Sequence, residues 1–293
     1  MDFRVSGLSP FPDSARSAPR ADPAKPRPPG FFKGTYGKEP LVPATPATTA
    51  RPVPAEQAAV AETYNRIGGL LTTLAMGEGL DVRAMLAVWC VESAGKAFVP
   101  RQAIIRFENH LFFREWGRFH PDAFDAHFQC GGRAGVPGKA WENHRFREVD
   151  SMPFVTLHDP SRSFKLQQQG EYRALEVART LAATAADPDA TPALRSISIG
   201  GCQILLSHHA KLGYPTPKAM YQAFQANERA HVLGFFDFCE QCPGAPGLTL
   251  LGHLRKLDWS GFARGYNGPG QVPRYSELLQ KLYARAEALF PHA

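Results

Sequence analysis

Proline is concentrated at one end of this chain, and this uneven distribution limits where regular structure can form. Residues 1–57 contain 12 of the 26 prolines in the 293-residue sequence. Proline lacks a backbone N–H donor and interrupts helices and central strands. The stretch 43–50, Pro-Ala-Thr-Pro-Ala-Thr-Thr-Ala, is also of low complexity. We therefore predict that residues 1–57 form an extended, largely disordered, basic tail.

The charge is divided unevenly between this tail and the rest of the chain. The net charge is +6, and residues 1–57 contribute half of it, with eight basic and five acidic residues. The remaining residues are nearly balanced and contain neither a dense basic helix nor an interleaved aromatic and basic motif. We therefore expect no nucleic-acid partner.

Targeting signals and cysteines restrict where the protein works. The sequence has no run of about 18 apolar residues, so no transmembrane helix is expected. Residues 1–7, Met-Asp-Phe-Arg-Val-Ser-Gly, do not form a secretory signal, and we expect synthesis in the cytoplasm without a signal peptide. The five cysteines are odd in number, which argues against a disulfide framework. Cys239 and Cys242 form a lone C-x-x-C, interpreted as two ordinary thiols at a helix end; we expect no metal site and no cofactor.

Beyond residue 57 the pattern is mainly helical. Apolar residues recur at three- and four-residue steps, and Asp81 is suited to cap the second helix. The short run 104–107 is β-branched and aromatic, which favours a strand. Residues 118–165 are rich in glycine and proline, and loops with a small hairpin are expected there. The predicted helices are 58–76, 81–92, 109–117, 170–185, about 193–211, 217–241, 248–256, 258–266 and 276–289.

Three short stretches carry residues suited to chemistry. In residues 89–95, Glu92 follows an apolar helix whose burial would raise the pKa of a carboxyl group toward that of a general acid. Residues 195–204 combine Gly200-Gly201 with Gln203, and residues 262–270 place Tyr266-Asn267 before Gly-Pro-Gly. Each stretch alone also fits a structural role, namely an exposed helix-terminal Glu, a close helix crossing and a helix stop.

Taken in order, these stretches resemble the signature of the lysozyme-like superfamily, and specifically the bacterial and phage N-acetylmuramidase domain family found in endolysins. The resemblance covers about residues 60–290. Its most specific part is Asp-Trp-Ser-Gly-Phe-Ala-Arg-Gly-Tyr-Asn-Gly-Pro-Gly at 258–270, and a further matching segment is Phe-Glu-Asn-His at 107–110. The implied fold is a lysozyme-like α+β domain over residues 58–293 that is mainly α, with a small irregular β and loop insertion.

The resemblance also implies an activity. We expect a glycoside hydrolase of the muramidase type, which cuts peptidoglycan at the β-1,4 bond after N-acetylmuramic acid without a metal or cofactor. Glu92 matches the family's catalytic Glu and is the expected general acid, and Glu108 is the candidate second carboxylate. Glycosidases commonly use such a pair. The residues expected to bind substrate are Ser93, Ser198, Gln203, Tyr266 and Asn267.

One departure from the family pattern leaves two alternatives open. Arg195 stands where many members have a Glu, so Glu108 must supply the second carboxylate or the activity is weakened. Two functions other than a muramidase therefore stay open. One is a lytic transglycosylase, which forms 1,6-anhydro products, and the other is a weak peptidoglycan-binding module of a phage or secretion apparatus. In either case the expected partner is the glycan strand, reached in the periplasm or wall through a holin or a secretion or injection system. The basic tail would attract the protein to this anionic polymer.

Overall fold

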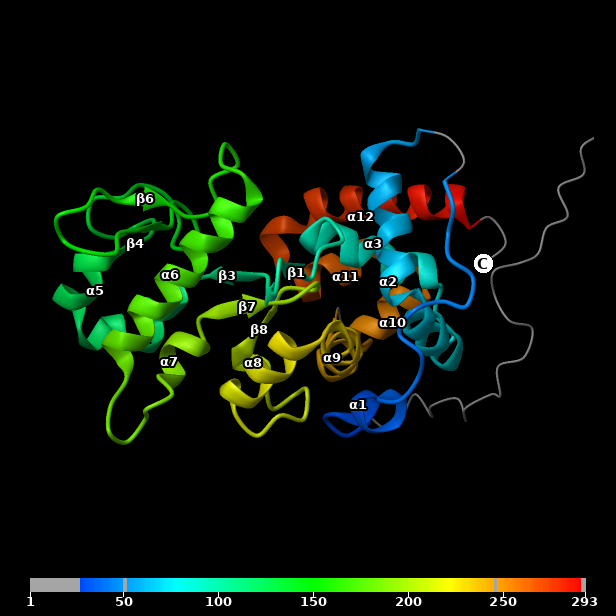
Figure 1. The fold of residues 1–293 in the computed structure, drawn as a ribbon, viewed down its shortest axis with the longest axis horizontal. Coiled ribbons are helices and arrows are strands. Elements are labelled where there is room, and N and C mark those ends of the chain that lie inside the picture. The colour runs from blue at the N-terminus through cyan, green and yellow to red at the C-terminus, as the bar shows by residue number, and fades with distance from the viewer. Residues whose placement is uncertain (1–26, 50–51, 245–246, 291–293) are drawn as a thin grey trace, which may run out of the picture. The chain divides into compact units, whose positions relative to one another are not determined.

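The computed structural model describes residues 27–49, 52–244 and 247–290. Most of these residues are helical, and the strands form three small antiparallel sheets (Figure 1). This confirms the mainly α class with a small β component. The chain divides into two compact units, which we call the helical unit (residues 1–96 and 228–293) and the central unit (residues 97–227). No helix within the described ranges is long and apolar enough to cross a membrane.

The helical unit is built around three long helices. Helix α3 (Val82–Ser93) packs against both α2 (Ala55–Glu78) and α12 (Val272–Leu289) (Figure 1). Its core includes the fully buried side chains of Ile67 and Trp89. The shorter helices of this unit are α1 (Phe31–Tyr36), α9 (Glu228–Gln241), α10 (Leu250–Arg255), α11 (Trp259–Tyr266) and the 3₁₀ turn η3 (Pro269–Gln271).

Local residue choice determines where the helices of this unit begin and end. Asp81 caps α3 as predicted, because its Oδ1 accepts the backbone N–H of Arg83 at 2.8 Å. Asp258 caps α11 in the same way through the N–H of Gly261, at 2.9 Å. Gly79 ends α2 at φ 63°, a left-handed conformation that glycine adopts without steric cost. The two aspartate caps fix where α3 and α11 begin, and these two helices carry candidate site residues.

The predicted tail is wrong for residues 27–49. Helix α1 packs on α9, with Phe32 completely buried and its ring 5.4 Å from that of Phe236. The backbone N–H of Phe32 donates to Asp237 Oδ1 at 3.0 Å, and Arg27 pairs with the buried Glu78 at 2.5 Å. The high proline content predicts disorder, but the burial of apolar side chains such as Phe32 offsets the conformational entropy lost when the segment is ordered. Residues 1–26, 50 and 51 of the predicted tail lie outside the described residues, and residues 55–57 already belong to α2.

The central unit contains the three sheets. Strands β3 (Ile105–Phe107), β7 (Ile197–Ile199) and β8 (Ile204–Leu205) form one sheet in that order, with Arg106 opposite Ser198. A second sheet joins β4 (Phe128–Gln129), β5 (Arg145–Phe146) and β6 (Val155–Thr156), and a two-stranded pair joins β1 (Phe98–Val99) and β2 (Gln102–Ala103). The helices of this unit are α4 (Asn109–Glu115), η1 (Gly117–Phe119), α5 (Pro121–His127), α6 (Phe164–Ala182), α7 (Thr191–Leu194), η2 (Leu206–His208) and α8 (Pro217–Ala226).

Two predictions in this unit need comment. The helix expected over about 193–211 is wrong, because α7 ends at Leu194 and β7 and β8 follow as a hairpin. The alternation Ile197-Ser198-Ile199 is a strand pattern, and β-branched residues favour that conformation. The small β component within 118–165 is confirmed as the β4-β5-β6 sheet, although helix α5 was not expected there.

Candidate active-site residues in the two units

Glu92 and Asn267 meet in the helical unit, although they lie 175 residues apart in the chain. Glu92 is in the last turn of α3, and Asn267 is the residue that ends α11. The Asn267 side-chain amide donates to Glu92 Oε1 at 2.9 Å. Val88 and Trp89, one turn before Glu92, are buried. This carboxylate is therefore attached to an apolar helix and oriented by an amide from another helix end.

Ser93 and Tyr266 flank this pair in sequence, and their side chains pack into the unit. Ser93 is buried, and its hydroxyl donates to the Trp89 carbonyl at 3.1 Å. The Tyr266 ring stacks on Phe262, with centroids 5.1 Å apart, and meets Phe238 edge to face at 5.5 Å. Both residues thus support the ends of α3 and α11.

Ser198 and Gln203 meet in the central unit, on the β7-β8 hairpin. The Ser198 hydroxyl donates to Gln203 Oε1 at 2.9 Å, and Gln203 Nε2 donates to the Gly200 carbonyl at 2.8 Å. Gln203 itself has φ 48° and Gly200 has φ 80°, so the turn is held in left-handed backbone conformations. The side chain of Gln203 therefore stabilises the hairpin from which it projects.

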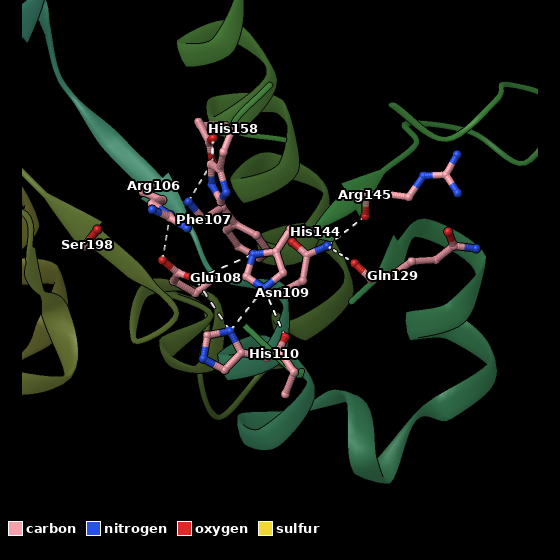
Figure 2. Close-up of polar contacts among 12 residues, drawn as sticks. Arg106, Phe107, Glu108, Asn109, His110, Gln129, His144, Arg145, His158 and Ser198 are labelled. Atoms are coloured by element: carbon pink, nitrogen blue, oxygen red, sulfur yellow. Dashed lines mark hydrogen bonds and ion pairs between the residues drawn. The ribbon is translucent and has the colours of Figure 1, made fainter. Parts of the chain in front are cut away.

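Glu108 follows β3 directly and is the N-cap residue of α4 (Figure 2). Its Oε1 pairs with Arg106 Nε at 3.0 Å, and its Oε2 lies 3.5 Å from His110 Nδ1 and 3.6 Å from His144 Nδ1. Burial raises the pKa of Glu108, and the Arg106 guanidinium opposes this in part. The same unit thus holds a shielded carboxylate with one cation and two imidazoles around it.

The sequence does not predict a functional role for either histidine. His110 belongs to the matching Phe-Glu-Asn-His segment, and His144 lies in the loop-rich stretch 118–165. Burial is the main cause that lowers the pKa of His110 to about 4 and that of His144 to about 3. Both rings are therefore neutral at pH 7. The two histidines are 34 positions apart, which carries no spacing signal, and only the fold brings His144 to Glu108 and His110.

Arg195, the departure from the family pattern, has a carboxylate partner. Its Nε donates to Glu115 Oε2 at 2.9 Å, and Glu115 lies in α4 next to Arg114. Arg195 therefore shares the Glu115 carboxylate with Arg114 within the central unit. The described cysteines, Cys239 and Cys242 among them, are buried.

A comparison with protein-family models matches residues 81–287 to the model described as "Muramidase: N-acetylmuramidase". The chain belongs to the N-acetylmuramidase family. The match begins at the cap of α3 and contains Glu92, Glu108 and Asn267. Helices α1 and α2 lie entirely outside the matched range, although they pack in the helical unit.

Family membership identifies this muramidase as a glycoside hydrolase with peptidoglycan as its substrate. No curated protein matches the chain. Among solved structures, the chain is similar to one titled "Crystal structure of Burkholderia AP3 phage endolysin", with 22% identity and a TM-score of 0.47. That similarity covers 82% of this chain and 74% of the other.

Proposed function

We propose that this muramidase cleaves the β-1,4 bond between N-acetylmuramic acid and N-acetylglucosamine, with Glu92 as the general acid. The hydrogen bond from Asn267 to Glu92 Oε1 carries the proposal. A carboxyl group that accepts this bond through Oε1 places its acidic proton on Oε2. That oxygen can then protonate the glycosidic oxygen as the bond breaks. Asn267 acts as the positioning residue.

Glu108 is proposed as the second carboxylate of the reaction. Burial raises its pKa, and the Arg106 guanidinium, 3.0 Å from Oε1, opposes this in part by favouring the ionised form. An ionised carboxylate can act as a base toward water or as a nucleophile toward the sugar. Many family members have a Glu where this chain has Arg195, which pairs with Glu115. Glu108 is therefore proposed to supply the second carboxylate by itself.

The remaining candidates are proposed to bind or shape the substrate site. Gln203 Nε2 carries two N–H groups, and only one is needed for Gly200, so the second suits the carbonyl of an N-acetyl group. Ser198 orients this amide. Tyr266 offers a ring edge and a hydroxyl for a sugar, while Ser93 supports the turn that presents Glu92. We further propose delivery to the wall through a holin or a secretion or injection system.

Digestion of isolated sacculi with the purified full-length protein tests the proposed reaction. Mass spectrometry should find muropeptides that end in reducing N-acetylmuramic acid. Reducing N-acetylglucosamine ends would show that the other glycosidic bond is cut. Termini with a 1,6-anhydro ring would identify a lytic transglycosylase, and binding to sacculi without any product would identify a glycan-binding module.

A further inference from the structure

The cluster formed by Glu108, His110 and His144 has a donor set that metal ions use in proteins. The ligand atoms of these three residues all lie within 4.8 Å of one another. Glu108 Oε2 is 3.5 Å from His110 Nδ1 and 3.6 Å from His144 Nδ1. Tetrahedral ligands that are each about 2.0–2.1 Å from a zinc ion lie about 3.3–3.4 Å apart. Small side-chain movements would therefore seat an ion among them.

The fold holds these ligands on rigid elements. Asn109, between the two ligands of α4, is completely buried. Its side-chain amide donates to the carbonyls of Gln129 and Arg145, each at 2.7 Å (Figure 2). These two bonds tie the start of α4 to β4 and β5, and His144 directly precedes β5. The second sheet is thereby attached to the helix that carries Glu108 and His110.

His144 supplies an independent indication of a ligand. Its ring is buried, and its Nδ1 makes no hydrogen bond to any described residue. Its Nε2 lies 3.2 Å from the Ala140 carbonyl and can donate a proton to it. The same Nε2 lies 3.3 Å from His110 Nδ1. With its proton on Nε2, His144 keeps a lone pair on Nδ1, the ring nitrogen that faces Glu108 (Figure 2). Metal-bound histidines commonly make such a bond from the other ring nitrogen.

Polar and charged groups surround the cluster. Glu108 is the carboxylate that would balance the charge of an ion, and it pairs with Arg106 Nε at 3.0 Å. Arg114 and the buried Glu171 also act electrostatically on members of the cluster. His158 lies 3.0 Å from Glu171 and extends the polar network behind the cluster. About a quarter of the His110 side chain is exposed, which gives an ion a route from solvent.

We propose that Glu108, His110 and His144 bind a divalent transition-metal ion such as Zn²⁺. Two imidazoles and one carboxylate are a common set of ligands for such ions and leave one coordination position for water. The site does not depend on the role of Glu92 in glycan cleavage. A bound ion would, however, occupy the carboxylate assigned above as the second catalytic group, so the loaded protein should digest sacculi more slowly.

Cobalt binding tests this site without reference to activity. Full-length protein is freed of metal with a chelator and titrated with Co²⁺, which reports four-coordinate sites through visible d–d absorption. We expect saturation at one ion per chain, displacement by Zn²⁺, and no thiolate-to-cobalt band in the near ultraviolet. Absence of d–d absorption, or a thiolate band from a cysteine site, would overturn the proposal.

Variants locate the ion. His110→Asn and Glu108→Gln should each weaken Zn²⁺ binding, measured by calorimetry, at least tenfold. His120→Asn replaces an exposed histidine of the same unit and should bind as the parent does. His144→Asn should also weaken Zn²⁺ binding, and it is compared only if its circular dichroism matches that of the parent. If the buried change prevents folding, His110→Asn still tests the site, because the His110 side chain is partly exposed. Equal affinity in the parent, His110→Asn and Glu108→Gln proteins would refute the site.

Discussion

Asn267 donates its side-chain amide to Glu92 Oε1 at 2.9 Å and so joins the end of α11 to the last turn of α3. Both residues lie in the helical unit and in the matched muramidase region. A catalytic carboxyl group must be held in a defined orientation, because small displacements of a general acid are costly. The bond therefore supports the positioning role proposed for Asn267.

Asn267→Ala should lower kcat on sacculi about 10- to 100-fold, equivalent to about 1.4–2.7 kcal/mol in the activation barrier. The reason is loss of orientation at Glu92, so KM should change less than kcat. A double-mutant cycle with Glu92→Gln checks the assignment, since residues that act as a unit give non-additive losses. Additive losses would show that Asn267 acts independently of Glu92.

Gln203→Gly should raise KM on soluble glycan fragments in a protein that remains folded by circular dichroism, although the hairpin loses the side-chain bond to Gly200. Gln203 has φ 48°, which glycine adopts without strain, so the change removes the side chain and keeps the backbone turn. The control is Ser198→Ala, which keeps the Gln203 amide but removes the hydroxyl that orients it. It should raise KM less than Gln203→Gly does. An unchanged KM in Gln203→Gly would remove this residue from the substrate site.

Phe32→Ala should reduce the free energy of unfolding by about 3–5 kcal/mol, measured by denaturant titration. The Phe32 ring is completely buried against α9, and its loss leaves a cavity. Val42→Ala is the matched control, because Val42 lies in the same N-terminal segment and is 57% exposed. Equal stabilities for the two variants would mean that α1 does not contribute to the fold.

The metal-free protein should lose stability as the pH falls from 6.5 toward 4. The folded state lowers the pKa of His110 to about 4, mainly through burial, so within this window the unfolded chain binds a proton that the folded chain does not. The free energy of unfolding should therefore fall by about 2 kcal/mol between pH 6.5 and 5 from this residue. His110→Asn should flatten the profile relative to the parent, whereas His120→Asn should not.

The sequence predicts the helices well because amphipathic spacing and caps are local signals. Asp81 and Asp258, for example, lie at helix starts because each carboxylate accepts a nearby backbone N–H. The β7-β8 hairpin departs from the predicted helix because the alternation at 197–199 is a short strand signal within a longer apolar stretch. Helix α1 is not predicted because prolines flank it at 28, 29 and 40, and the burial of Phe32 is not visible in the sequence.

The candidate site also has features that the sequence predicts and features that depend on the fold. Family resemblance identifies Glu92, Glu108 and Asn267 by the order of their motifs, and the hydrogen bond between Glu92 and Asn267 could only come from the fold. The cluster of Glu108 with His110 and His144 depends on the contact of α4 with the second sheet. No local pattern encodes a contact between residues so distant in the chain.

The role of Glu92 is tested most directly by the release of soluble muropeptides from sacculi by Glu92→Gln. Its matched control is Glu62→Gln, which replaces an exposed Glu of α2 in the same unit. With circular dichroism and melting temperature unchanged, we predict that Glu92→Gln reduces the initial rate at least 1,000-fold and that Glu62→Gln retains the parental rate. A folded Glu92→Gln protein that releases muropeptides at the parental rate would contradict the assignment of Glu92 as the general acid.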